Sequence, residues 1–192
     1  MTPLQRPVIL SLTGMHESGM RMLREAGELR MASATDSETL HREVVDADAV
    51  ILRTGGIIDA PVMDRGPRLK VVGRHGVGYD AIDVDAATAR GIQVVYTPGA
   101  NTQSVAEHVF AMMIGLSKHF TRMARAVDAY DYHARTRWTG RDLFGRSLGI
   151  VGFGRIGRRV GAMARAGFDM TVRYHDIVAA PPDVEASAGA VR

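Results

Sequence analysis

Short apolar runs alternate with stretches of helical spacing along the first half of the chain. Each run is short enough for a buried strand, and each stretch between them places its apolar residues on one face of a helix. The predicted strands are 8–12, 49–52, 69–73 and 92–96. The predicted helices are 15–26, 36–45, 59–64 and 84–90. Strands separated by helices form parallel sheets with right-handed crossovers, so this pattern predicts an α/β unit.

The next stretch of the chain is mainly helical. Apolar side chains recur at helical spacing over 102–118, a second helical stretch covers 120–134, and 135–146 is predicted to be a loop. Asn101 is predicted to cap the first of these helices, and His108 to be a core histidine. We interpret the region as a connector between two units. Met112 and Met113 are interpreted as packing residues, with a dimer surface as the alternative.

A second α/β pattern begins at residue 148. An apolar run, 148–151, precedes three spaced glycines, a helical stretch and another apolar run, 170–174. Gly152 permits a tight turn, Gly154 lets the backbone approach a pyrophosphate, and Gly157 lets helix and strand pack closely. The phosphates then lie against free N–H groups at the positive end of the helix. The pattern predicts a dinucleotide site, and the alternative is a βαβ unit without a ligand.

An acidic residue follows this pattern at Asp176. It stands close to the spacing of about 20 residues expected for a carboxylate that binds the adenosine ribose. An acid there repels a 2′-phosphate and favours NAD over NADP, although Arg158 and Arg173 weaken that preference. A solvated carboxylate is the alternative. No element is predicted for 179–192, which is rich in alanine and proline. We therefore expect an incomplete second domain with exposed apolar surface on 149–174.

Glycines also follow the third predicted strand. The segment 74–80 contains Gly76 and Gly78, and backbone N–H groups at the carboxyl end of a strand bind anions in α/β sheets. We predict a carboxylate cradle there, with a ligand-free glycine turn as the alternative. Arg53 ends the second predicted strand. Its planar guanidinium either pairs with a substrate carboxylate or lies on the surface without a ligand.

Composition limits the classes of function. Of 192 residues, 46% are hydrophobic and 23% charged, which is ordinary for a globular protein. The lack of cysteine excludes disulfides and thiolate metal sites, and the histidines have no metal-site spacing. An evenly spread net charge of +3 does not indicate nucleic-acid binding. The longest apolar stretch, 109–116, is too short to span a bilayer and no signal peptide is evident, so we expect a cytoplasmic protein.

Two separate motifs together resemble one family. The first comprises 73–83 (Gly-Arg-His-Gly-Val-Gly-Tyr-Asp-Ala-Ile-Asp), 86–88 (Ala-Ala-Thr), 91–92 (Gly-Ile), 97–99 (Thr-Pro-Gly) and 105–108 (Val-Ala-Glu-His). The second is 149–157 (Gly-Ile-Val-Gly-Phe-Gly-Arg-Ile-Gly). In this order they resemble the D-isomer-specific 2-hydroxyacid dehydrogenases. The resemblance implies an α/β fold with Rossmann/flavodoxin-like parallel sheets and helices on both faces.

The resemblance also implies an order of domains. A substrate domain would occupy 1–98, connecting helices 99–146, and the first half of an NAD-binding Rossmann domain 147–192. The helices within 102–134 would form a homodimer.

Site residues follow from the same resemblance. The implied substrate-binding positions are Arg53, His75, Gly76, Val77 and Gly78. The implied cofactor-binding positions are Val77, Ser104, Val105, Gly152, Gly154, Arg155, Ile156, Gly157 and Asp176. Ser104 and Val105 would face the nicotinamide, and Arg155 and Ile156 would lie under the pyrophosphate. One residue more than in many members separates Gly157 from Asp176, which leaves His175 as the alternative acid position.

The chemistry implied by the resemblance is NAD-dependent hydride transfer between the nicotinamide and C2 of a D-2-hydroxy or 2-keto acid. In this family an arginine binds the substrate, and a histidine paired with a glutamate transfers the proton. All three are expected after Arg192, so no catalytic residue is expected in this chain. We expect it to be truncated and inactive alone. The alternative is a non-catalytic NAD-binding regulatory module of the corepressor type.

Overall fold

The structure, a computed structural model, describes residues 6–192. The chain divides into two compact units, the first ending at Ala100 and the second beginning at Asn101. Each unit has its own parallel sheet and its own hydrophobic core. None of the described helices combines the length and apolar character that a membrane crossing requires.

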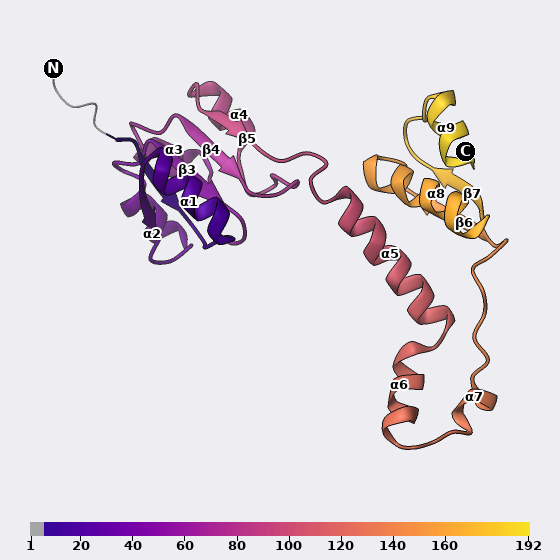
Figure 1. The fold of residues 1–192 in the computed structure, drawn as a ribbon. Coiled ribbons are helices and arrows are strands. Elements are labelled where there is room, and N and C mark those ends of the chain that lie inside the picture. Colours follow the sequence, from indigo (N-terminus) through magenta and orange to yellow (C-terminus); the bar gives the residue numbers. More distant parts are fainter. Residues whose placement is uncertain (1–5) are drawn as a thin grey trace. The chain divides into compact units, whose positions relative to one another are not determined.

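The first unit is built on a five-stranded sheet, coloured indigo to magenta in Figure 1. Its strands are β1 (Val8–Ser11), β2 (Glu28–Met31), β3 (Ala49–Leu52), β4 (Val71–Arg74) and β5 (Gln93–Val95). Its helices are α1 (Glu17–Ala26), α2 (Ser37–Glu43), α3 (Ala60–Arg65) and α4 (Val84–Ala89). All neighbours pair in parallel, in the order β2-β1-β3-β4-β5, which confirms the α/β prediction. In sheets of this flavodoxin-like order, ligands bind beyond the carboxyl ends of the strands.

The core of the first unit follows from its central strands. Leu10, Val50 and Val72 are neighbours in register across β1, β3 and β4, and all three are buried. Such continuous apolar strands are typical of parallel sheets whose faces are both covered. Each of α2, α3 and α4 begins after an aspartate whose carboxylate accepts the N–H three residues later, at 2.8–3.1 Å. These caps satisfy N–H groups that have no partner within the helix and so set where each helix starts.

Strand β2 is absent from the predicted strands. Its residues are mostly exposed, and it lies at the edge of the sheet, where one face carries polar side chains. Arg30 on this strand pairs with Glu28 and Asp46, which belongs to the segment before β3. Because the strand is stabilised by pairing with β1 and not by its own apolar content, hydrophobic pattern alone does not reveal it.

The second unit contains a three-stranded parallel sheet, in the order β6-β7-β8. The strands are β6 (Ser147–Val151), β7 (Thr171–His175) and β8 (Ala190–Val191). The helices are α5 (Thr102–Ser117), α6 (Phe120–Asp128), α7 (Ala134–Arg137), α8 (Arg155–Phe168) and α9 (Pro182–Ala188). Helix α5 packs against α8, and Phe110 of α5 shares a buried cluster with Phe153 and Val160. Residues 152–154, which contain two of the three glycines, join the end of β6 to the start of α8, as the pattern predicts.

Two predicted boundaries in this unit are wrong. A single helix over 120–134 does not form, because α6 ends at Asp128 and Tyr130 takes a positive φ of 53°. Helix α7 then lies partly within the predicted loop. The segment 179–192, for which no element was expected, contains α9 and β8.

The buried hydroxyl of Tyr174 holds this last segment in place. It accepts the Ala180 N–H at 2.8 Å and donates to Glu185 at 2.5 Å. Burial raises the pKa of this hydroxyl, so it stays protonated and able to donate. The last segment is thus organised by long-range contacts with β7.

Candidate functional site

A loop at the carboxyl end of β4 carries the predicted substrate positions. The His75 N–H donates to the Leu52 carbonyl at 2.9 Å, so the loop starts beside the end of β3. Arg53 follows Leu52 directly, and the side chains of Arg53 and His75 are exposed. The structure therefore brings all five predicted substrate positions to one edge of the first sheet.

The backbone of this loop offers free donors. Within residues 6–192, the N–H groups of Val77, Gly78 and Tyr79 have no hydrogen-bond acceptor. The carbonyls of Gly76 and Gly78, in contrast, are both bonded within the protein. Successive free N–H groups form a concavity that suits an anion, so the loop can hold a carboxylate without a cationic side chain.

The second candidate site is the glycine loop between β6 and α8. Gly152 has φ +90°, and its N–H donates to the His175 carbonyl at 2.8 Å. A Cβ on Gly157 would lie 2.2 Å from the Gly152 carbonyl oxygen, so only glycine permits the close approach of helix and loop. These two glycines are required by the fold itself.

Gly154 differs from its two neighbours in the motif. Its φ is −75°, which any residue adopts, and a Cβ there would have no atom within 4 Å. Neither backbone conformation nor internal packing explains a glycine at this position. The missing side chain instead leaves the loop open to close approach from outside, which a pyrophosphate requires.

The start of α8 adds donors to this loop. Gly154 occupies the N-cap position and has no side chain to accept the first N–H groups of the helix. No acidic residue lies in the first turn. The N–H groups of Arg155 and Ile156 have no protein acceptor in the described chain. A helix N-terminus with free N–H groups carries a partial positive charge and favours phosphate. The donors present therefore fit a dinucleotide pyrophosphate.

Asp176 lies at the same loop. One carboxylate oxygen accepts the Phe153 N–H at 2.5 Å, and the other accepts the Val178 N–H at 3.1 Å. These bonds, with that from Val178 the larger influence, lower the pKa of Asp176 below its ordinary range. The His175 side chain is exposed, and its carbonyl holds Gly152. Asp176 thus contacts the glycine loop through its carboxylate, whereas His175 contacts it through its backbone carbonyl.

Ser104 and Val105 lie in the first turn of α5 and make no hydrogen bond to the glycine loop within residues 6–192. Their neighbour Gln103 accepts a hydrogen bond from Arg159 of α8 at 2.5 Å, which holds the two helices together. Two expectations for this helix are wrong. Asn101 is at the cap position but makes no side-chain cap bond, and His108 is exposed.

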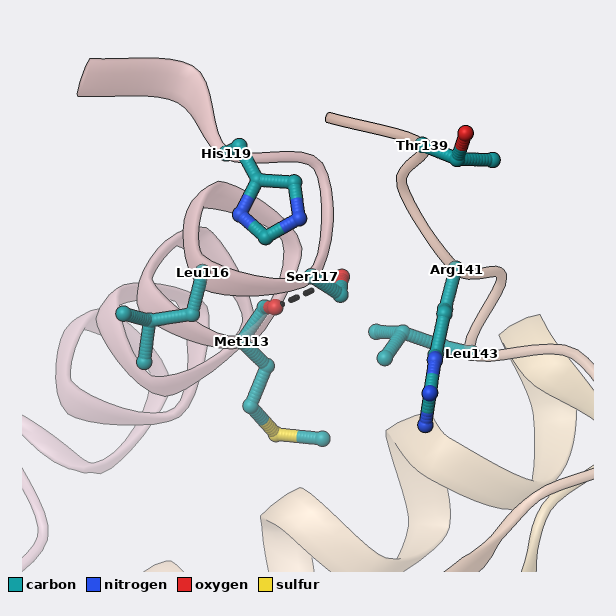
Figure 2. A pocket seen from close by; sticks show the side chains of 7 residues that line it. All are labelled: Met113, Leu116, Ser117, His119, Thr139, Arg141 and Leu143. Atoms are coloured by element: carbon teal, nitrogen blue, oxygen red, sulfur yellow. Dashed lines mark hydrogen bonds between the residues drawn. The ribbon is translucent and has the colours of Figure 1, made fainter. Parts of the chain in front are cut away.

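Two open apolar surfaces occur in the second unit. A groove of about 390 Å³ lies along β6, the edge strand of this sheet, and is lined in part by Val109, Ile150 and Ile156. Val151 beside it is 89% exposed, in agreement with the expected apolar surface. A second groove, of about 630 Å³, lies at the end of α5. It is lined by Met113, Leu116, Ser117, His119, Thr139, Arg141 and Leu143. Figure 2 shows the side chains that line it. In the described part of the chain, no three potential metal-ligating side chains gather.

Comparison with known proteins gives a consistent result. A sequence profile described as "D-isomer specific 2-hydroxyacid dehydrogenase, catalytic domain" matches residues 8–175. The D-3-phosphoglycerate dehydrogenase of Methanocaldococcus jannaschii is 36% identical over 168 residues, which cover 88% of this chain and 32% of that protein. The glyoxylate reductase of Thermococcus kodakarensis is 35% identical over 195 residues, covering 96% of this chain and 58% of that protein.

A solved structure is also similar. The crystal structure of D-lactate dehydrogenase from Aquifex aeolicus, complexed with NAD and lactic acid, matches with a TM-score of 0.81 at 28% identity. The match covers 96% of this chain and 55% of that chain. The present chain thus spans about a third of the length of the first relative and just over half of the other two.

Proposed function

The chain belongs to the D-isomer specific 2-hydroxyacid dehydrogenase family, and we propose that it serves NAD-dependent hydride transfer to or from C2 of a D-2-hydroxy or 2-keto acid. In this proposal the second unit binds the dinucleotide and the first unit binds the acid. The nicotinamide, when bound, would accept the hydride in its oxidised form and donate it in its reduced form. The residues of this chain bind and orient the two reactants.

The observation that carries the proposal is the open face of Gly154. Neither its backbone nor its packing requires glycine, whereas a pyrophosphate on the loop does. Arg155 and Ile156 offer N–H groups to the phosphates, and Asp176 offers a carboxylate to the ribose diol. That negative charge disfavours a 2′-phosphate, which supports NAD as the cofactor. Gly152 and Gly157 keep the loop in this conformation. In this proposal Ser104 and Val105, in the first turn of α5, would lie beside the nicotinamide.

The substrate carboxylate is assigned to the loop after β4. Val77 and Gly78 supply free N–H donors, and Gly76 precedes them in the loop. Arg53 and His75 add exposed cationic or polar side chains on the same edge of the sheet. These groups suit a small 2-keto or 2-hydroxy acid.

We propose that the proton-transferring group lies outside the described residues, since no histidine ring within 6–192 is hydrogen-bonded to a carboxylate. We therefore expect the 192 residues by themselves to bind NADH without steady-state turnover of glyoxylate or hydroxypyruvate. The regulatory alternative predicts the same binding, and a downstream arginine, glutamate and histidine in the gene would exclude it.

A homodimer is the proposed assembly. Support comes from the apolar side chains that α5, α6 and the following turn expose, including Leu116, Phe120, Val127 and Tyr130. The groove of Figure 2 lies beside them. Clustered exposed apolar side chains of this kind are typical of interaction surfaces.

Titration of the purified chain with NADH, followed by fluorescence, tests the proposal. Gly154→Ala should fold normally, since nothing lies within 4 Å of the new Cβ, yet bind NADH about tenfold or more weakly. Gly167→Ala is the matched control, because Gly167 is an exposed glycine of α8 with equally open surroundings. Equal affinity of all three proteins, or no binding by the wild type, would contradict the proposal.

A further inference from the structure

Arg74, the last residue of β4, bridges two carbonyls at the edge of the first sheet. Its Nε donates to the Gly78 carbonyl at 2.5 Å, and its Nη1 donates to the Arg53 carbonyl. The guanidinium therefore links the far end of the loop after β4 to the residue that follows β3. A rigid planar fork suits this role, because one side chain fixes two acceptors at once.

Thr97, which lies two residues after β5, holds the near end of the same loop. Its backbone N–H and its Oγ1 hydroxyl both donate to the Gly76 carbonyl, each at 3.0 Å. Thr97 lies 21 positions further along the chain than Gly76, in the segment after β5. The loop is thus held at two carbonyls, by Arg74 of β4 and by Thr97.

Holding these carbonyls also orients the free donors. A trans peptide is planar, so its C=O and the following N–H point in opposite directions. The Gly76 carbonyl belongs to the same peptide as the Val77 N–H, and the Gly78 carbonyl to the same peptide as the Tyr79 N–H. When Thr97 and Arg74 bind the two carbonyls, the Val77 N–H therefore points away from Thr97 and the Tyr79 N–H points away from the Arg74 guanidinium.

We propose that Arg74 and Thr97 are positioning residues, which aim the N–H groups of Val77 and Tyr79 at the carboxylate of the substrate. The inference rests on the proposed function of this loop as the substrate cradle. Neither residue needs to touch the acid. The proposed arrangement adds the backbone N–H of Tyr79 to the cradle. It also explains how a glycine-containing loop keeps its donors in fixed positions. The charge of the Arg74 guanidinium at the loop adds to the attraction for an anion.

The test uses the whole 192-residue chain, with oxalate as a stable dicarboxylate probe and two-dimensional amide NMR as the readout. Thr97→Val removes the hydroxyl and keeps the backbone N–H, while Thr97→Ser retains both the hydroxyl and the N–H. Arg74→Lys keeps the charge and loses the fork. Arg90→Lys is the control, since Arg90 bridges Asp64 and the Ala86 carbonyl elsewhere in the first unit.

In the wild type, oxalate should shift the Val77 and Tyr79 amides in a saturable manner. Thr97→Val and Arg74→Lys should weaken the affinity about fivefold or more, the usual effect of one hydrogen bond. Thr97→Ser and Arg90→Lys should bind like the wild type, and all variants should keep the wild-type circular dichroism. Before oxalate is added, the amides of 76–79 should already differ in the two weakened variants.

The outcomes separate the two claims. Should the wild type bind oxalate and both Arg74→Lys and Thr97→Val bind it equally well, the positioning role is wrong and the cradle stands. Should oxalate leave the wild-type amides unmoved, the cradle itself is wrong and the positioning role falls with it. An affinity of Thr97→Ser for oxalate as weak as that of Thr97→Val would also count against the positioning role.

Discussion

The Oδ2 atom of Asp176 accepts a hydrogen bond from the backbone N–H of Phe153 at 2.5 Å. This bond joins the end of β7 to the glycine loop after β6, across 23 positions of sequence. The second oxygen of the carboxylate accepts the Val178 N–H, so both sides of the group are held. The carboxylate of Asp176, which is proposed to bind the ribose, is therefore fixed in place by the protein itself. It also helps to hold the loop on which the phosphates would lie.

Replacing this carboxylate should alter cofactor preference. Asp176→Asn keeps the size of the side chain but removes the charge that favours a ribose diol and repels a 2′-phosphate. The ratio of NADPH to NADH dissociation constants should fall about tenfold or more, because hydrogen bonds to charged groups are among the stronger ones. Fluorescence titrations with both nucleotides give the ratio. Asp169→Asn, which changes an exposed aspartate at the other end of α8, should leave it unchanged.

Gly157→Ala should destabilise the second unit. Its Cβ would lie 2.2 Å from the Gly152 carbonyl oxygen, which is backbone and cannot rotate away. Helix α8 must then shift from the loop, at a cost of roughly 1–3 kcal/mol. Thermal unfolding followed by the fluorescence of Trp138, the only tryptophan and a residue of this unit, measures the change. Gly167→Ala, in the same helix but exposed, should not lower the melting temperature, and a similar loss in both variants would show that the contact is unimportant.

The first unit should lose a specific stabilising contact in acid. The Asp48 carboxylate accepts the Val8 N–H at 2.9 Å and pairs with Arg68 at 2.5 Å. The bond from Val8, followed by that from Arg68, lowers the pKa of Asp48 in the folded state. A lowered folded pKa means that this stabilisation is present above the ordinary carboxyl pKa of about 4 and is lost as the pH falls through the folded value.

Asp48→Asn should therefore cost about 1–3 kcal/mol near neutral pH, because it leaves the charge of Arg68 without its partner and weakens the acceptor of the Val8 N–H. Its difference from the wild type should shrink below about pH 4. Urea unfolding followed by circular dichroism at several pH values gives the comparison. Asp128→Asn, an exposed aspartate of α6, should behave like the wild type throughout. A difference that is constant with pH would refute the ionic explanation.

Two matched variants, one in each unit, test the proposed homodimer. Leu116, at the groove in Figure 2, is 77% exposed, and Met22 on α1 of the first unit is 67% exposed. Leu116→Glu places a charge in the proposed contact and should convert a dimer to a monomer, since an unpaired charge is costly to bury. Met22→Glu changes a similarly exposed apolar residue and should leave the dimer intact. Light scattering coupled to size-exclusion chromatography measures both, and a monomeric wild type would contradict the assembly.

Much of the scaffold is local enough to be inferred from residue order. Buried central strands such as β3 are short apolar runs, and Asp36, Asp59 and Asp83 mark helix starts through bonds that reach only three residues ahead. The glycine spacing likewise depends on one turn and the helix after it. The edge strand β2 lacks such a signal, because its place depends on pairing with β1.

The sequence by itself determined the alternation of strands and helices, the two glycine loops and the position of Asp176, because each follows from periodicity or spacing within a short segment. Only the tertiary structure decided which groups at those loops are free to bind. Gly154 faces open space, whereas Gly157 meets the Gly152 carbonyl. Arg74 and Thr97 occupy loop carbonyls and leave N–H groups without acceptors in the described chain. The bond from Thr97 to Gly76 joins segments that follow two different strands, so its geometry is set by the packing of the whole sheet.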